Sequence, residues 1–249
     1  MHRKNIDMNI LQKINNSKGE VAVLIDPEKT FKKIQIEKLI NKINDSNISF
    51  IFVGGSTFKK LKLDPIIKQI KNLSKVPVII FPGNHTQVSP HADGIFYLSL
   101  LTTKNPQFLI DEQIKSTPKI IKSNLEVIPT GYILLDETGK SSTSKITQNT
   151  TNKTSKKELL NLSLTAKFLG KKLIIFDKGS GAKNSIQNID FNKIKEKTNL
   201  PIIVGGGVKT TKEIIKLKKL GSNIIIVGNF IEENLDFLDE IKKMNLNIK

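Results

Sequence analysis

Glycine follows two consecutive apolar segments near the C-terminus of this 249-residue chain. Residues 201–204 (Pro-Ile-Ile-Val) and 224–227 (Ile-Ile-Ile-Val) each read as a buried strand. The residues that follow them are Gly205, Gly206, Gly207, Gly228 and Asn229. Glycine lets backbone N–H groups approach an anion closely, and the loops after strands 7 and 8 are the usual phosphate site of a (β/α)8 barrel. The sequence therefore predicts a site for a phosphorylated small molecule, although two ordinary strand-to-helix turns would carry the same glycines.

A third loop of similar composition follows the apolar segment 173–176. It consists of Asp177, Lys178, Gly179, Ser180 and Gly181. Glycine N–H groups and a serine hydroxyl are suitable donors to a phosphate, and a lysine adds positive charge. We therefore expect three neighbouring loops to converge on one phosphate, with the carboxylate of Asp177 beside it as the candidate catalytic base. A plain loop with an exposed acid is the alternative.

Oxygen ligands for a divalent cation follow the first two apolar segments. Asp26 lies between segment 21–25 and Pro27, and Ser56 comes shortly after segment 50–53. Carboxylate and hydroxyl oxygens suit Mg²⁺, so Asp26 and Ser56 are the candidate metal ligands. Either residue could instead cap the helix that follows it.

These loops need a scaffold in which strand ends meet. Apolar, β-rich runs alternate with segments of helical period along the chain, which predicts a parallel sheet covered by helices. The expected strands are 21–25, 50–53, 78–81, 94–98, 126–135, 173–176, 202–204 and 224–227, and the expected helices are 31–43, 61–73, 107–122, 156–169, 189–197, 212–220 and 232–244. Eight units in this length favour a closed (β/α)8 TIM barrel over an open doubly wound sheet. We expect a single domain over residues 1–249, with residues 1–20 as a helical extension.

Two segments depart from this alternation. Residues 82–93 contain two prolines and no apolar periodicity, so an extended loop is expected to replace the third helix and leave a gap for a long substrate or another subunit. His85 and His91 of this loop are expected at the surface. Residues 138–155 are rich in serine and threonine and read as a long loop on the active-site face rather than a linker. Tyr132 follows a bend in the fifth strand and could shape a pocket.

Composition excludes several classes of function. The chain has no cysteine, which rules out thiolate catalysis and cysteine-ligated zinc. Its net charge of +17 comes from dispersed lysines, so no nucleic-acid partner is expected, while weak attraction to an anionic membrane surface stays open. No signal-peptide core and no apolar run of roughly 18 residues are present, which predicts a soluble cytoplasmic protein.

An ordered set of short motifs runs from about Val21 to the C-terminus. The motifs are Leu-Ile-Asp-Pro-Glu-Lys (24–29), Phe-Val-Gly-Gly-Ser (52–56), Phe-Pro-Gly-Asn (81–84), Leu-Ser-Leu-Leu (98–101), Asn-Pro-Gln-Phe (105–108), Pro-Thr-Gly-Tyr-Ile (129–133), Gly-Ser-Gly-Ala (179–182), Val-Gly-Gly-Gly-Val (204–208) and Val-Gly-Asn (227–229). Each motif is weak alone, but in this order the chain resembles the geranylgeranylglyceryl phosphate synthases and their bacterial relatives.

The resemblance implies a prenyltransferase on a barrel whose third helix is replaced by an extended segment. In that family, sn-glycerol 1-phosphate attacks C1 of a polyprenyl diphosphate, which forms an ether and releases pyrophosphate. Asp26 and Ser56 match the family's Mg²⁺ positions. The glycine-rich loops after the sixth, seventh and eighth strands match its glycerol-phosphate cradle, and an apolar groove near the gap would take the isoprenoid tail. Family members form dimers or hexamers, so a homo-oligomer is expected.

The chain departs from the family where the chemistry is expected. The family has Tyr-Leu-Glu-Ala before Gly-Ser-Gly, whereas residues 175–178 here are Ile-Phe-Asp-Lys. The carboxylate of Asp177 therefore lies about one methylene further back, and an error of about 1 Å in a catalytic group can cost ~100-fold in rate. Two alternatives remain at this point: a sugar-phosphate isomerase or aldolase barrel, and a catalytically decayed barrel that binds phosphates or lipid surfaces. The first explains the glycine loops but not Asp26 with Ser56.

Overall fold

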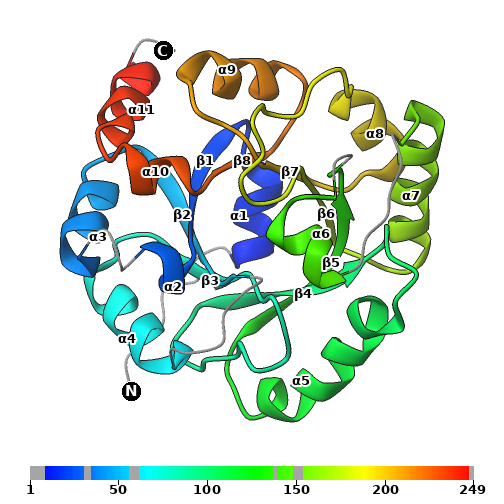
Figure 1. Ribbon diagram of the computed structural model, residues 1–249, viewed down its shortest axis with the longest axis horizontal. Helices are drawn as coiled ribbons and strands as arrows, with labels where there is room; N and C mark the ends of the chain where they lie inside the picture. Colours follow the sequence, from blue (N-terminus) through cyan, green and yellow to red (C-terminus); the bar gives the residue numbers. More distant parts are fainter. Residues whose placement is uncertain (1–8, 31–34, 56–61, 137–138, 148–153, 247–249) are drawn as a thin grey trace.

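Eight parallel strands close into a barrel in the order β1 to β8, with β8 paired to β1 (Figure 1). The computed structural model describes residues 9–30, 35–55, 62–136, 139–147 and 154–246. The strands are β1 (Glu20–Ile25), β2 (Ile48–Val53), β3 (Val78–Ile80), β4 (Gly94–Leu100), β5 (Glu126–Leu134), β6 (Leu173–Asp177), β7 (Ile202–Gly205) and β8 (Ile224–Val227). The predicted TIM barrel is confirmed.

Helices surround the barrel and follow every strand except β3 (Figure 1). They are α1 (Ile10–Asn16), α2 (Pro27–Thr30), α3 (Ile36–Asn44), α4 (Leu63–Leu73), the π-helical turn η1 (Gln107–Asp111), α5 (Glu112–Ile121), α6 (Ser142–Thr147), α7 (Lys156–Phe168), α8 (Phe191–Thr198), α9 (Thr211–Lys219), α10 (Phe230–Glu233) and α11 (Phe237–Leu246). Within the described residues, no helix is long and apolar enough to cross a membrane.

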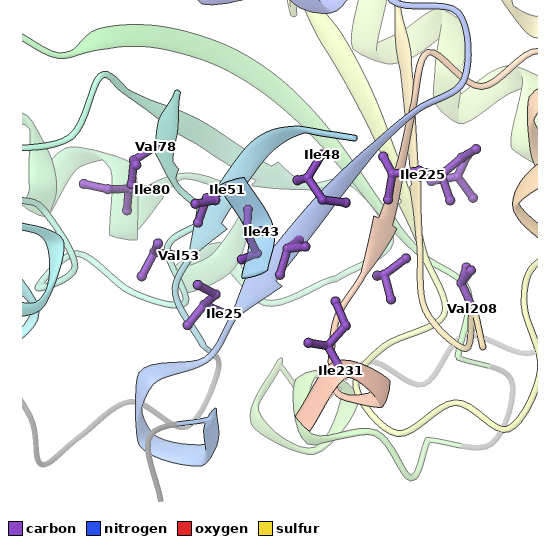
Figure 2. Packing of buried hydrophobic residues seen from close by; sticks show 14 of the residues in the cluster. Ile25, Ile43, Ile48, Ile51, Val53, Val78, Ile80, Val208, Ile225 and Ile231 are labelled. Atoms are coloured by element: carbon purple, nitrogen blue, oxygen red, sulfur yellow. The ribbon is translucent and has the colours of Figure 1, made fainter. Parts of the chain in front are cut away.

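Side chains of each strand alternate between two hydrophobic cores. In β2, Phe50 and Phe52 point into the barrel, while Ile51 and Val53 point towards the surrounding helices. Figure 2 shows part of the outer core, where Ile43 of α3 lies among side chains of the first two strands. Strands that are buried on both faces must be apolar at every position, which is why they appear in the sequence as continuous runs.

Helix α1 closes the N-terminal end of the barrel. Ile10 and Ile14 are buried in the inner core. The backbone N–H groups of Ile10 and Leu11 donate to the two carboxylate oxygens of Glu126, at 2.6 and 2.9 Å, at the start of β5. A carboxylate at a helix N-terminus satisfies free N–H groups and interacts favourably with the helix dipole. The contact leaves the opposite end of the barrel as the open one.

Residues 81–93, all of which are described, contain no helix, so the predicted replacement of the third helix by a loop is confirmed. Polar contacts hold this loop in place. The buried Gln87 side chain accepts from the N–H groups of Gly55 and Gly83 and donates to the Gly55 carbonyl, at 3.3, 3.1 and 2.8 Å. The loop is therefore tied to the C-terminal end of β2 by hydrogen bonds rather than by a packed helical face.

Two predictions about helices need correction, and a third is tested only in part. The predicted helix 232–244 is two helices, α10 and α11, because residues 234–236 break from helical geometry. The predicted loop 138–155 contains the short helix α6, capped by the Ser141 hydroxyl, which accepts from the Ser144 N–H at 3.0 Å. In the predicted helix 31–43, residues 31–34 lie outside the described part of the chain, and α3 begins at Ile36.

Candidate active site

A cavity of about 310 Å³ opens at the C-terminal ends of the barrel strands. Its walls come from the ends of β1 and β2, the loop after β3, β4, η1 and α5, and the loops after β5 to β8. This is the end of the barrel at which (β/α)8 enzymes carry their active sites. Asp26, Asp177 and the three predicted glycine loops all contribute to the lining, so the fold brings most of the predicted site residues to one place.

Asp177, the last residue of β6, is held by hydrogen bonds to both of its carboxylate oxygens. The Tyr132 hydroxyl on β5 donates to Oδ2 at 2.7 Å, and the Gly179 N–H donates to Oδ1 at 2.9 Å. Tyr132 was expected to shape a pocket, but its contact with Asp177 was not predicted. The contact follows from the pairing of β5 with β6, and that register cannot be read from the sequence.

The surroundings of this pair move the pKa of both groups. Burial raises the pKa of Asp177, and the hydrogen bonds from Tyr132 and Gly179 oppose that rise, while the nearby Asp136 carboxylate adds to it. Burial also raises the pKa of Tyr132 well above its usual range, and the charge of Asp177 and the hydrogen bond to it raise it further. A carboxyl group with a raised pKa beside a cavity is a candidate proton acceptor.

The glycine loop after β7 fits its surroundings only because it carries no side chains. Gly206 and Gly207 have φ values of +90° and +71°, which other residues rarely adopt. A Cβ at Gly206 would lie 2.7 Å from the Lys178 backbone nitrogen, and one at Gly207 would lie 2.3 Å from the Asn184 carbonyl oxygen. The loop is therefore a close-packed surface of backbone beside Asp177, which suits a phosphate.

The loops after β6 and β8 are joined by a side-chain hydrogen bond. The Asn229 amide donates to the Ser180 hydroxyl at 2.9 Å. The short helix α10 begins directly after Asn229. A short extra helix in this loop is a recurrent part of barrel phosphate sites. Gly181, Gly205 and Gly228 line the same part of the cavity, so the structure brings the three loops together.

Two lysines near the loops differ in their position. The residues described as lining the cavity include Asp177 and Gly179 but not Lys178 between them. The Lys178 N–H instead donates to the Gly205 carbonyl at 3.2 Å. Lys209, which was not predicted as a site residue, does line the cavity. Its place two residues after Gly207 is the sequence signal that could have identified it.

Asp26 lies at the C-terminal end of β1, almost fully buried, and lines the cavity. A Cβ at Gly55 would lie 2.6 Å from its carboxylate, so the backbone after β2 approaches Asp26 closely. Ser56, the second predicted metal ligand, lies outside the described residues. Among those described, no cluster of three or more His, Asp or Glu side chains is placed to hold a metal. Mg²⁺ commonly binds one or two carboxylates together with substrate phosphates, so a single buried carboxylate beside an anion site fits this ion.

The side of the cavity next to the loop after β3 is apolar. Phe81, Leu98 and Phe108 line it, and the rings of Phe81 and Tyr132 meet edge to face with centroids 5.8 Å apart. Edge-to-face contacts of this kind fix ring orientation. This apolar wall joins the polar loops at Tyr132, so one cavity combines a polar and an apolar half.

A carboxylate–histidine pair borders the apolar half. Glu112 of α5 accepts from the His85 N–H at 2.6 Å and contacts His85 Nδ1 at 2.7 Å. Burial acts to raise the pKa of Glu112, but hydrogen bonds from His85 and Gln107 outweigh it and lower that pKa. Both residues line the cavity. Sequence reasoning placed His85 at the surface and did not consider Glu112, because their contact joins segments 27 positions apart.

This closed (β/α)8 barrel carries a carboxylate, glycine-rich loops and an apolar wall at the C-terminal ends of its strands. That is the architecture of a barrel enzyme. Residues 13–245, which are most of the chain, match the PcrB family. The chain belongs to the PcrB family. It is 35% identical over 238 residues to a geranylgeranylglyceryl phosphate synthase of Flavobacterium johnsoniae, covering 94% of this chain and 96% of that protein.

Two further comparisons agree with this family. A geranylgeranylglyceryl phosphate synthase of Chitinophaga pinensis is 36% identical over 242 residues, covering 97% of this chain and 95% of that protein. The crystal structure of (S)-3-O-geranylgeranylglyceryl phosphate synthase from Thermoplasma acidophilum, in complex with its substrate sn-glycerol-1-phosphate, superimposes with a TM-score of 0.85 at 28% identity. That match covers 96% of this chain and 98% of the other. The resemblance expected from the motifs is confirmed.

Proposed function

We propose that this protein is a prenyltransferase that joins a polyprenyl diphosphate of the geranylgeranyl type to sn-glycerol 1-phosphate, yielding an ether-lipid precursor and pyrophosphate. One observation carries the proposal: a partly buried carboxylate, Asp177, lies between glycine loops suited to a phosphate and an apolar wall suited to a hydrocarbon chain. The names of its relatives support the same reaction.

Substrate binding is assigned to the three loops. The N–H groups of the loops around Gly179 and Gly206, with the hydroxyl of Ser180 and the amide of Asn229, hold the phosphate of the glycerol substrate. Lys209 offers a positive charge at the same end of the cavity. Lys178 contributes through its backbone position, which fixes the spacing of the β6 and β7 loops.

Asp177 acts as the general base in this proposal. The glycerol hydroxyl oxygen attacks C1 of the prenyl diphosphate, its proton passes to the Asp177 carboxylate, and the bond from C1 to the diphosphate oxygen breaks. Pyrophosphate leaves with the electron pair. The raised pKa makes the Asp177 carboxylate a stronger base than an ordinary aspartate, which favours its role as proton acceptor.

Asp26 and Ser56 would hold Mg²⁺, and of these Asp26 is described in the lining of the same cavity. A bound Mg²⁺ supplies positive charge that stabilises a leaving diphosphate. The apolar wall of Phe81, Leu98 and Phe108 excludes water from the carbon that is attacked.

The same proposal covers the protein's surroundings. We propose a single domain over residues 1–249 in the cytoplasm, assembled as a dimer or hexamer, with no nucleic-acid partner. Weak association with anionic membranes is supported by the net charge of +17 and would bring the enzyme near a lipid substrate.

Turnover of the purified protein tests the function. The assay contains Mg²⁺, sn-glycerol 1-phosphate and a panel of prenyl diphosphates, with sn-glycerol 3-phosphate as the matched control. We expect an ether product from the 1-phosphate and much less from the 3-phosphate. Binding of glycerol phosphate without product from any donor would contradict the proposal and favour a barrel that only binds phosphates.

A further inference from the structure

Tyr132 joins the two halves of the cavity: its ring contacts Phe81 of the apolar wall, and its hydroxyl donates to Asp177 of the polar half. We propose that Tyr132 is a positioning residue whose hydroxyl holds the Asp177 carboxylate in the orientation needed to accept the substrate proton. The inference rests on the proposed function for its kinetic consequence, but the contact itself is testable without turnover.

The two hydrogen bonds to Asp177 reach different oxygens of its carboxylate. Tyr132 on β5 donates to Oδ2, and Gly179, in the loop that follows β6, donates to Oδ1. An ionised carboxylate has about four lone-pair sites, so each oxygen keeps capacity for a further donor. With both oxygens held, the short side chain of Asp177 has one preferred orientation, and a substrate hydroxyl completes the set of donors rather than replacing one.

The tyrosine ring is itself fixed. Tyr132 is 5% exposed, and its ring meets Phe81 edge to face at an interplanar angle of 84°. In the pairing of β5 with β6, Tyr132 lies opposite Ile175, which is fully buried. A rigid ring between these neighbours delivers its hydroxyl to one point, which is the property that a positioning residue requires.

No second phenol can take this role. The chain has only two tyrosines, and the hydroxyl of the other, Tyr97, donates to the Gln113 carbonyl at 3.0 Å and lies 2.9 Å from the Thr117 hydroxyl. Ile175, the residue of β6 nearest to Tyr132 in the register, carries no hydrogen-bonding side chain. Thr143 of α6 hydrogen-bonds the Tyr132 hydroxyl from the loop side, so the donor to Asp177 is itself oriented.

The first test reads the contact by ultraviolet absorbance. The chain has no tryptophan, so in a Tyr97→Phe background the ionisation of Tyr132 is the sole phenol signal. We compare Tyr97→Phe with Tyr97→Phe/Asp177→Asn. The charge of Asp177 raises the pKa of Tyr132, so the second variant is expected to titrate at lower pH. An unchanged titration of two variants that circular dichroism shows to be folded over the same pH range would overturn the contact, and with it the proposal.

The second test reads the kinetic consequence. Tyr132→Phe removes the hydroxyl and keeps the ring. A hydrogen bond to a charged group is worth roughly 10- to 100-fold, so we expect kcat to fall by about that factor. The KM for glycerol phosphate should change less. Thr130→Val is the matched control, since it removes a buried hydroxyl from the same strand that donates to the Ile128 carbonyl instead. An equal kcat for Tyr132→Phe and the wild type would overturn the proposal.

A pH profile separates positioning from a merely structural role. The groups that face Asp177 are the Tyr132 hydroxyl, the Gly179 N–H and the Asp136 carboxylate. Because the Tyr132 hydrogen bond opposes the rise in the pKa of Asp177, its loss should move the acidic limb of kcat/KM to higher pH. The limb should stay in place for Thr130→Val. A Tyr132→Phe variant whose acidic limb does not move would contradict the proposal. A wild-type protein without turnover would contradict the proposed function instead, and the absorbance test would then decide whether the contact exists.

Discussion

The two halves of the cavity are built in different ways. The phosphate half consists of glycine loops whose shape depends on positive φ values and on backbone packed against backbone, as at Gly206 and Gly207. The apolar half consists of side chains from the loop after β3, from β4 and from η1, and hydrogen bonds of Gln87 hold that loop in place. The difference teaches that a side chain cannot be added at Gly206 or Gly207 without strain, whereas we expect a wall of side chains to accept smaller residues with a milder loss. Substitutions should therefore affect turnover and substrate affinity to different degrees, depending on the half of the cavity in which they fall.

The largest effect is expected at the junction of the halves. Asp177→Ala removes the proposed base, and general-base catalysis contributes about 10²- to 10⁴-fold, so kcat should fall by that order. The affinity for glycerol phosphate should change much less, because the glycine loops remain. Steady-state kinetics together with calorimetric binding separates the two quantities. Undiminished turnover would remove Asp177 from the mechanism.

A smaller but still large effect is expected in the phosphate half. Gly206→Ala introduces a Cβ that would lie 2.7 Å from the Lys178 nitrogen and 2.9 Å from Asp177 Oδ1, at a φ of +90°. Strain of this kind costs about 1–3 kcal/mol, so affinity for glycerol phosphate should fall roughly 10- to 100-fold.

Gly170→Ala is the control for that variant. Gly170 also has a positive φ, +73°, but a Cβ there would meet nothing within 4 Å. It should lower the stability of the protein by about 1 kcal/mol and leave glycerol-phosphate affinity unchanged. Equal calorimetric affinities for Gly206→Ala and the wild type would break the contrast between the two halves.

The apolar half should respond more mildly. Phe108→Ala removes one partly exposed ring from the wall, so KM for the prenyl diphosphate should rise by about 10-fold while the affinity for glycerol phosphate stays the same. Phe168→Ala on α7 is the matched control, since that ring is 79% exposed and does not line the cavity. A change in glycerol-phosphate affinity for Phe108→Ala would show that the halves are not separate.

The smallest effect concerns stability at the edge of the apolar half. The fold lowers the pKa of Glu112, so its stabilising contribution is present above the usual glutamate pKa and is lost as pH falls through the folded pKa. Glu112→Gln should therefore destabilise the protein by about 1 kcal/mol at neutral pH, and the difference from the wild type should shrink in acid. Urea unfolding at both pH values measures this.

An equal loss of stability for Glu112→Gln at neutral and acid pH would contradict the assigned role of the His85 contacts.

The sequence predicted most of the barrel because each strand is buried on both faces and therefore appears as an apolar run. The missing third helix was also predictable, since two prolines and no apolar period leave a helix nothing to pack with. The break between α10 and α11 was not predicted, because residues 232–244 keep enough helical period to conceal it. The short helix α6 was missed because its serines and threonines have low helix propensity and are typical of loops.

The polar half of the site was easier to predict than its contacts. Glycines after strands are visible in the sequence, so the loops that contain Gly179, Gly206 and Gly228 could be named. The hydrogen bond from Tyr132 to Asp177 depends on the register between β5 and β6, and the pair of His85 with Glu112 depends on the path of an irregular loop. Neither of these contacts can be predicted from the local sequence. The role of Ser56 as a metal ligand stays a prediction.

A crystal structure with sn-glycerol 1-phosphate and an unreactive prenyl diphosphate analogue tests the central claim most directly. The account predicts the glycerol phosphate against the loops of Gly179, Gly206 and Asn229, with a glycerol hydroxyl within hydrogen-bonding distance of Asp177. It also predicts the prenyl chain along Phe81 and Phe108. A glycerol hydroxyl bound away from Asp177, or a prenyl chain outside the apolar half, would contradict the account.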